Sequence, residues 1–327
     1  MGKSKKPLKA VLQSQQSRLK LKQKASQAAQ TAQLMSKKHG GAKGKPRLDA
    51  GNVKGKRKEV PLPRRPTIPF RATDRILLIG EGNFSFARAL VRGAPAELEH
   101  LPPKNVTATA YDTEQECYGK YPEAEDIVRE LRAGGTEVFF GIDATQLGKV
   151  AAFKGKKWDK IVWNFPHAGK GLTDQDRNIL SNQLLILGFL GSAADFLVNG
   201  PVPEIFSSKK RKRPDDDDGP DEEDLDTDME DDNIAQPVTY RGTILITLRN
   251  VVPYTQWDVP RLAKNPPPPA SGSAPKNPPY VLLRSFHFQR STWKGYEHRM
   301  TKGERAHRTG KTGEGGEDRT WQFCLKD

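Results

Sequence analysis

Two polar turns, each placed after a short apolar run, hold the residue types most suited to chemistry in this chain. The first turn follows residues 76–79 and reads Gly80, Glu81, Gly82, Asn83, Phe84 and Ser85. The second follows residues 160–163 and reads Asn164, Phe165, Pro166 and His167. A glycine-rich turn lets the backbone approach a nucleotide, because glycine has no Cβ and accepts a positive φ. The second turn combines an amide, an aromatic ring and an imidazole, which suits a planar nitrogen base.

The charge of the first turn indicates which nucleotide it binds. A dinucleotide fold places a third glycine where this chain has Ser85, and the Glu81 carboxylate would repel a pyrophosphate at the helix N-terminus. A ligand with a cationic centre and no phosphate tolerates that acid. S-adenosylmethionine, with its sulfonium and amino groups, is such a ligand, and we predict that residues 80–85 bind it. An ordinary glycine turn is the alternative for this motif alone.

Two acids follow the next predicted strands. Asp112 ends the strand 106–111, where its two carboxylate oxygens are placed to accept from the ribose hydroxyls. Asp143 ends the strand 136–142, at a position that lies beside the adenine in this architecture. A local helix cap is the alternative role for each acid, since Asp commonly caps helices after strands.

Apolar periodicity predicts the elements that position these turns. Four-residue apolar runs and β-branched segments indicate strands, and repeats of three and four residues indicate helices. Strands are predicted at 76–79, 106–111, 136–142, 160–163, 242–248 and 280–288, with an edge strand at 321–325, and helices at 84–92, 123–133 and 173–198. This alternation predicts an α/β fold, a mostly parallel sheet with helices on both faces.

Composition divides the chain into a tail and one domain. Residues 1–70 carry 19 Lys and Arg against 2 Asp and Glu, whereas the whole chain carries 54 against 40, so the basic excess belongs to this tail. The tail has too few apolar residues to form a core, and we expect it to be disordered in isolation and to bind RNA. The domain is predicted at 71–327, with disordered insertions at 200–237 and 263–279.

Further segments indicate partners. Lys209 to Arg213 is a basic run that fits a nuclear import signal, with a charge-balanced loop as its alternative, and 13 acids follow in residues 215–232. Cations alternate with aromatic residues late in the chain, a pattern suited to looped RNA, and the residues predicted to contact the substrate there are Trp293, Lys294, Tyr296, His298 and Arg299.

The remaining features restrict the class of protein. The two cysteines, Cys117 and Cys324, have no metal-site spacing and indicate a reducing compartment. We predict no metal site. The apolar segment 184–198 contains Asp195 and is shorter than a membrane span, so we predict a buried helix and no membrane partner. We expect a monomer.

Four stretches of this sequence resemble a known family. ILLIGEGNFSF, WDKIVWNFPHAGKG, GTILITLRN and WKGYEHRMT, within residues 71–327, are similar to the large-subunit ribosomal RNA uridine-N3-methyltransferases of fungi. The resemblance implies a Rossmann-like fold, S-adenosylmethionine as cofactor, and a nuclear, nucleolar location with ribosomal RNA or a pre-ribosomal particle as partner. It also implies that residues 80–85 hold the methionine end, that Asp112 holds the ribose, that Asp143 flanks the adenine and that residues 164–167 face the base.

The reaction expected of that family fits the second turn. N3 of uracil must lose its proton to become a good nucleophile, and His167 is the residue predicted to take it or to donate to a carbonyl oxygen. Asn164 is predicted to orient the ring and to border the cofactor, with Phe165 and Pro166 contacting the base. Three other classes stay open at this point: a non-catalytic assembly factor, an amino methyltransferase on another base or on protein, and a nicotinamide enzyme, which Glu81 and Ser85 disfavour.

Overall fold

The computed structural model describes residues 13, 17, 65–203, 239–269, 276–300 and 316–327. The predicted tail lies almost entirely outside these residues, as do the run Lys209 to Arg213, the acidic run that follows it and most of the first insertion. The second insertion is described at 263–269 and 276–279.

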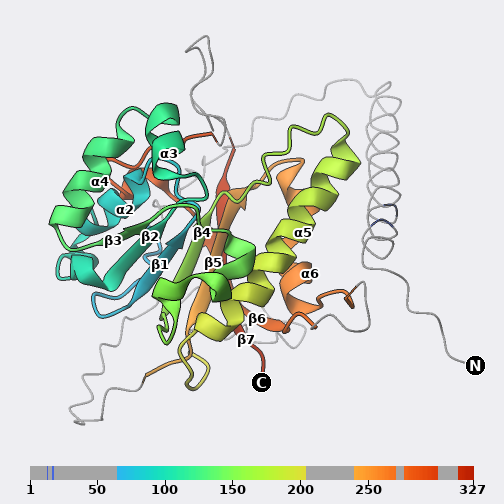
Figure 1. Cartoon of the computed structure of the whole chain (residues 1–327). Helices are drawn as coiled ribbons and strands as arrows, with labels where there is room; N and C mark the ends of the chain where they lie inside the picture. Colours follow the sequence, from blue (N-terminus) through green and yellow to red (C-terminus); the bar gives the residue numbers. More distant parts are fainter. Residues whose placement is uncertain (1–12, 14–16, 18–64, 204–238, 270–275, 301–315) are drawn as a thin grey trace, which may run out of the picture.

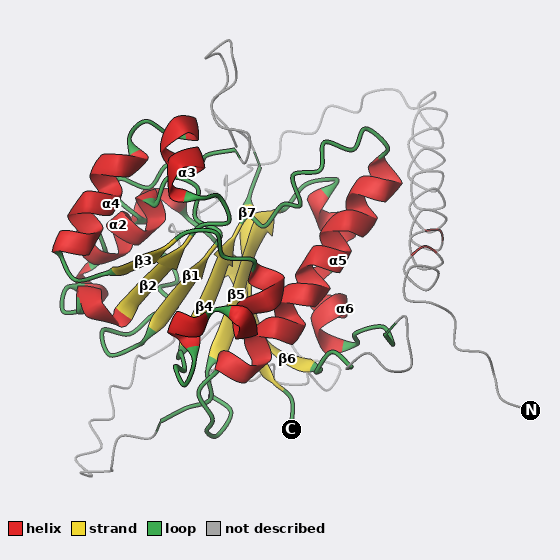
Figure 2. Ribbon diagram, viewed as in Figure 1, coloured by secondary structure: helices red, strands yellow, loops and turns green. Residues whose placement is uncertain are grey.

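A seven-stranded sheet forms the centre of the domain (Figures 1 and 2). The strand order is β3-β2-β1-β4-β5-β7-β6, with β1 at Ile76–Ile79, β2 at Val106–Thr109, β3 at Glu137–Phe139, β4 at Lys160–Asn164, β5 at Thr243–Arg249, β6 at Tyr280–His287 and β7 at Asp318–Leu325. The first five strands pair in parallel. Among the described strands, β7 runs antiparallel to both of its neighbours, β5 and β6, and the other six strands share one direction, so the predicted mostly parallel sheet is confirmed.

The prediction that residues 321–325 form an edge strand was wrong. Strand β7 begins earlier, at Asp318, and lies between β5 and β6, with Phe323 and Cys324 fully buried. Strand β6 occupies the edge, and its side chains are mostly part-exposed. A strand inside the sheet and a strand at its edge can have the same apolar alternation, so the sequence pattern did not reveal that β7, the last strand in the chain, is inserted between two others.

Helices cover both faces of the sheet, as predicted. The helices α2 (Ser85–Arg92), α3 (Glu114–Lys120) and α4 (Ala124–Ala133) lie on one face, and α5 (Gln175–Ala193) and α6 (Val259–Lys264) lie on the other (Figure 1). Alternate residues of β1 supply the two cores, since Ile76 and Leu78 join one and Leu77 and Ile79 join the other. This two-sided burial explains the continuous apolar run of a central parallel strand.

The helix α5 differs from the predicted helix at 173–198 in its end and in the burial of one residue. It ends at Ala193 and not at residue 198, and Leu184, in the segment predicted to be buried, is 38% exposed. With the following turn, α5 is long and apolar enough to cross a membrane by length and composition alone. Its residues Ile186, Leu187 and Leu190 are buried in the core against the sheet, which is the environment expected of a core helix.

The lead-in before β1 packs on the domain. Phe70 is buried, and its ring lies 5.7 Å from that of Trp293, with an edge-to-face geometry. The ordered packing therefore begins before residue 71, where the domain was predicted to start. Proline-rich segments such as residues 66–69 hold an extended shape, and an extended segment can lie along a sheet face at low entropic cost.

Candidate active site

The glycine loop joins β1 to α2 at the carboxyl edge of the sheet. Gly80 adopts a φ of 63°, and a Cβ placed on it would lie 2.8 Å from Nε1 of Trp163, so only glycine fits there. Gly82 has ordinary space around it: the nearest atoms to a Cβ would be those of Tyr121 at 3.5 Å. Asn83 accepts from the backbone N–H of Ser85 at 3.2 Å and donates to Glu123 at 2.8 Å. These bonds fix the loop against the starts of α2 and α4.

Glu81 turns its carboxylate toward the N-terminus of α2. Its Oε2 accepts from the backbone N–H of Ala87 at 3.3 Å. Burial raises the pKa of this carboxyl to about 7, and the helix N–H groups limit the rise because they favour the charged form. Glu81 therefore changes charge near neutral pH, beside the place where a cationic cofactor is predicted.

Tyr111 and Asp112 follow β2 and line the same cleft. Asp112 Oδ1 accepts from Lys120 at 2.6 Å. The alternative role of Asp112 as a helix cap is excluded, because Thr113 caps α3 through a reciprocal bond pair with Glu116. Tyr111 is 72% exposed, a high value for an aromatic residue, and its ring is available to a ligand in the cleft.

The second turn begins where β4 ends. Asn164 and Phe165 line the cleft, and Phe165 adopts a φ of 53°, which is rare for an aromatic residue. The ring of His298 lies 4.3 Å from that of Phe165. Within the described part of the chain, Asn164 Oδ1 is a buried acceptor with no hydrogen-bond partner. Buried polar atoms without partners are uncommon in native structures, and one at a cleft indicates that a ligand supplies the donor.

Residues 294–300, which we call the strap, cross the glycine loop and close one side of the cleft. The Ser85 hydroxyl donates to the carbonyl of Glu297 at 3.0 Å and accepts from its N–H at 3.1 Å. The Tyr121 hydroxyl donates to the carbonyl of Met300 at 2.7 Å, and Arg299 pairs with Glu123 at 2.8 Å. The strap therefore forms part of the candidate cofactor site, in addition to any contact with RNA.

The two turns and the strap enclose one cleft of about 660 Å³, including space that is open to solvent. Its lining comes from the ends of β1, β2 and β4 and from the strap, and consists of Gly80, Glu81, Gly82, Asn83, Ser85, Tyr111, Asp112, Tyr121, Asn164, Phe165, Tyr296, Glu297, His298 and Arg299. The carboxyl ends of neighbouring parallel strands are where ligands bind in such folds.

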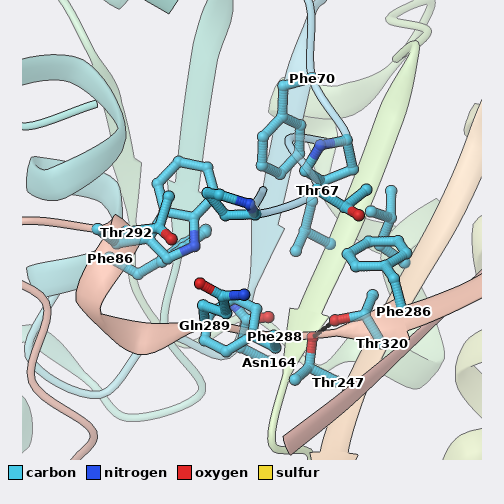
Figure 3. A pocket seen from close by; sticks show the side chains of 15 residues that line it. Thr67, Phe70, Phe86, Asn164, Thr247, Phe286, Phe288, Gln289, Thr292 and Thr320 are labelled. Atoms are coloured by element: carbon cyan, nitrogen blue, oxygen red, sulfur yellow. Dashed lines mark hydrogen bonds between the residues drawn. The ribbon is translucent and has the colours of Figure 1, made fainter. Parts of the chain in front are cut away.

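Asn164 also borders a second, mostly apolar pocket under the lead-in, which Figure 3 shows from close by. Phe70, Phe86 and Phe288 contribute rings to this pocket, and the hydroxyls of Thr247 and Thr320 are hydrogen-bonded to each other at 2.9 Å (Figure 3). Asn164 thus lies between the cleft and the aromatic packing behind it.

Several residues predicted from the sequence lie outside the cleft lining. Phe84 is fully buried, and its ring packs 5.3 Å from that of Phe140. Asp143 caps the turn 144–149 by accepting from Thr145 and Gln146, which is the local alternative stated for it. Trp293 is 4% exposed and packs in the core, so it is not available to stack on an RNA base. Lys294 is exposed and lies next to Gly93, at the end of α2.

His167 also lies away from the cleft lining. It is exposed, its Nδ1 accepts from the N–H of Gly169 at 2.9 Å, and its ring lies 5.9 Å from that of Trp257, on the α6 side. Pro166, next to it, is buried and does not line the cleft. The turn thus points Asn164 and Phe165 toward the candidate site and His167 away from it, which adjacent positions in a tight turn commonly do.

Sequence reasoning missed four residues around the site. Tyr111, Tyr121 and Glu297 line the cleft, and Arg290 places its guanidinium carbon 5.0 Å from the ring centroid of Phe165. Tyr111 directly precedes Asp112, so its position carried a usable signal. The other three gave none, because they reach the site through long-range packing.

The fold and the cleft together define a class of protein. A sheet of six parallel strands with an antiparallel strand inserted before the last, a glycine loop after β1 and an acid after β2 make this a Rossmann-like methyltransferase. The predicted fold class is confirmed.

Comparison with known proteins identifies the family. Residues 77–300 match the family described as BMT5-like, rRNA (uridine-N3-)-methyltransferase, and the chain belongs to it. The 25S rRNA (uridine(2634)-N(3))-methyltransferase of Saccharomyces cerevisiae is 32% identical over 263 residues, which cover 72% of this chain and 69% of that protein. The mouse ferredoxin-fold anticodon-binding domain-containing protein 1 homolog is 37% identical over 123 residues, 38% of this chain and 18% of that protein.

One solved structure is also similar, that of a 16S rRNA (adenine(1408)-N(1))-methyltransferase mutant from Catenulisporales acidiphilia. It is 12% identical, covers 77% of this chain and 88% of that chain, and has a TM-score of 0.31. The family membership confirms that the chain is an rRNA uridine-N3-methyltransferase and excludes the three other classes that the sequence left open.

Proposed function

We propose that this chain transfers the methyl group of S-adenosylmethionine to N3 of a uridine in large-subunit rRNA, within the nucleolus. The observation that supports the proposal most directly is the convergence of the glycine loop, Asp112 and the Asn164 turn on one cleft. The yeast relative acts on 25S rRNA by its name, which supports a large-subunit substrate.

The cleft residues fit the cofactor in shape and charge. Gly82 leaves open the space that a longer side chain would fill, and three carboxylates, those of Glu81, Asp112 and Glu297, line the cleft against one Arg299. An acidic lining favours a ligand that carries sulfonium and ammonium groups. We propose that residues 80–83 and Ser85 hold the methionine end, that Asp112 binds the ribose and that Tyr111 covers the adenine. When bound, the cofactor supplies an electrophilic methyl group.

Asp112→Asn should weaken the binding of S-adenosylmethionine by about tenfold, because hydrogen bonds to a charged acceptor contribute roughly 1.5–3 kcal/mol and the amide keeps part of this. Isothermal calorimetry with S-adenosylhomocysteine measures the change. Asp126→Asn, an exposed acid on α4 that pairs with Arg129, is the matched control and should bind normally. Equal affinity of Asp112→Asn and wild type would remove Asp112 from the ribose site.

The chain's own residues then select and orient the base. Asn164 Oδ1, buried and without a partner among the described residues, can accept a hydrogen bond from the ligand that occupies the cleft and so help to orient it. A paired uridine hides N3 in its base pair, so the target lies in a loop or is extruded. His298, Tyr296 and Arg299 of the strap stand at the cleft and are the predicted substrate contacts that we retain.

The location and partners of the protein rest on sequence features outside the described residues. We propose that Lys209 to Arg213 binds a nuclear import receptor and that the basic tail binds ribosomal RNA or a pre-ribosomal particle as the enzyme, a monomer, acts.

Nucleoside mass spectrometry of large-subunit rRNA from cells with and without this gene tests the proposal. We expect 3-methyluridine to fall in the absence of the gene and to return with the wild-type chain. An unchanged content of 3-methyluridine in large-subunit rRNA would contradict the proposed substrate. The same measurement on small-subunit rRNA would then test whether the enzyme methylates that RNA instead.

A further inference from the structure

Aromatic and cationic side chains gather around Phe165 at the carboxyl edge of the sheet. The Arg290 guanidinium lies 5.0 Å from the ring centroid of Phe165, and the imidazole of His298 lies 4.3 Å from it, centroid to centroid. We call Arg290, Phe165 and His298 the Phe165 cluster. Phe165 and His298 line the cleft, next to Asn164. The proposed function assigns no role to Arg290.

Arg290 is held in place by a buried acid. Its Nε donates to Asp318 Oδ2 at 2.6 Å, and the side chains of Arg290 and Asp318 are 25% and 8% exposed. Asp318 Oδ1 has no hydrogen-bond partner among the described residues, so the pair is joined through Oδ2 alone. A guanidinium cannot lose its proton in a protein, and partial burial reduces the solvent screening of its charge.

A second arginine, Arg249, adds to the positive potential. Burial is the main cause that lowers the pKa of His298 to about 4, and the charges of Arg290 and Arg249 lower it further. The imidazole of His298 is therefore neutral at physiological pH and is a poor proton acceptor, although it can still donate one hydrogen bond and accept another. The cluster thus combines a neutral hydrogen-bonding ring with the guanidinium of Arg290, whose charge Asp318 offsets in part.

We propose that Arg290 stabilises the anionic form of the target uracil, with His298 as a hydrogen-bond partner of the ring, so that uridine reacts as its imide anion and no side chain serves as general base. This inference rests on the proposed function, because it assumes that the base occupies the cleft beside Phe165. Arg290 acts through its field across the Phe165 ring and is a positioning residue in this scheme.

The step balances without a protein base. The uracil N3–H proton passes to hydroxide or buffer base in solution, and the positive potential favours the resulting anion. The N3 electron pair forms the new bond to the methyl carbon while the carbon–sulfur bond breaks and its electrons stay on sulfur. The negative charge of the uracil anion and the positive charge of the sulfonium cancel in this transfer, so the products are neutral 3-methyluridine and a neutral thioether, and the released proton carries the remaining charge.

Besides the uracil imide, the carboxyl of Glu81 titrates near the pH at which the rate is measured. The charged and titratable groups near the cluster include Arg249, Arg290, Asp318, His298, Tyr296 and Glu81, together with Glu297 and Arg299, which pair with each other beside His298 in the strap. Burial raises the pKa of Tyr296 far above neutral, whereas the pKa of Glu81 is about 7. A rate that follows the ionisation of Glu81 is therefore the competing explanation for any pH dependence near 7, and the test separates the two.

The test is the pH dependence of single-turnover methylation, measured on large-subunit rRNA from cells that lack the gene. For the wild type we expect the rate to rise with pH to a plateau, with its midpoint below that of free uridine. Arg290→Gln should raise the midpoint by about one pH unit, which lowers the rate below the midpoint about tenfold and leaves the plateau. Arg129→Gln, an exposed arginine on α4, is the matched control.

A substrate change keeps the test decisive if Arg290→Gln fails to bind S-adenosylhomocysteine by calorimetry. RNA made with 5-fluorouridine has a more acidic imide, and the wild-type midpoint should then move to lower pH. If the midpoint moves neither with Arg290→Gln nor with 5-fluorouridine RNA, it reports the ionisation of an enzyme group, Glu81, and the inference is overturned. A different outcome would contradict the proposed function itself: wild-type enzyme that forms no 3-methyluridine at any pH.

Discussion

Gly82→Arg is expected to abolish the binding of S-adenosylmethionine and leave the fold intact. The first atom of the new side chain fits, since a Cβ at this position meets nothing closer than Tyr121 at 3.5 Å. The rest of the arginine must extend into the cleft that Gly82 lines, and it brings a positive charge to a site proposed for a cationic ligand. Like charges a few ångströms apart in such a site cost about 3 kcal/mol, so affinity should fall roughly a hundredfold or more.

Calorimetry with S-adenosylhomocysteine and with S-adenosylmethionine measures this loss and separates its two causes. The first ligand lacks the sulfonium charge, so a larger loss for the second isolates the electrostatic part. Gly119→Arg is the matched control, because a Cβ on that exposed helical glycine meets no heavy atom within 4 Å. Gly82→Ala should bind nearly normally. Retained affinity in Gly82→Arg, with normal thermal unfolding, would place the cofactor elsewhere.

Glu81→Gln is expected to raise the free energy of unfolding above pH 7 by about 3 kcal/mol and to change little at pH 4.5. The pKa of Glu81 is about 7 in the folded chain against 4.5 ordinarily, so the folded state holds the proton more tightly than the unfolded state. Ionisation of Glu81 therefore opposes folding: the cost is absent below pH 4.5, grows up to pH 7 and is complete above it. The glutamine oxygen can still accept from the N–H of Ala87.

Urea unfolding of the cofactor-free protein between pH 4 and 8 measures the effect, as a difference between variant and wild type at each pH. The difference is needed because His298 acts with the opposite sign. Its pKa of about 4 lies below the ordinary 6.5, so its contribution to stability is present above pH 6.5 and is lost as pH falls toward 4. The two slopes oppose each other in the wild type. Glu99→Gln, at an exposed position, serves as control, and a difference for Glu81→Gln that stays constant across pH would contradict the burial of this acid.

Local sequence patterns were enough to predict β1, the strand that precedes the glycine loop. The bounds of β1 were predicted to the residue, because an apolar run that ends in glycine has few other interpretations. The third strand was predicted to reach residue 142 and stops at Phe139, because Gly141 adopts a φ of 68° and its N–H bonds the carbonyl of Asp112 instead. That bond is a tertiary contact, and a propensity argument contains no information on it.

The candidate site was predictable where a residue follows a strand and not where it arrives from elsewhere. Asp112 and Asn164 reach the cleft because strand ends meet at one edge of a parallel sheet. The direction of each side chain within a tight turn was not predictable, which is why His167 was expected at the site and lies on the α6 side. The core position of Trp293 was missed for a related reason, since aromatic residues among cations fit either a buried anchor or an RNA contact.

The strap is synthesised long after the glycine loop that it contacts. The two hydrogen bonds between Ser85 and Glu297 join positions 212 residues apart in the chain. During synthesis, the glycine loop leaves the ribosome long before the wall that closes its cleft, so a nascent chain carries the loop without a complete cofactor site. A chain that stops before residue 294 keeps both sequence motifs but also lacks β7, the strand between β5 and β6, so its sheet is incomplete. Such a truncated product should neither retain cofactor nor compete for it with the full enzyme.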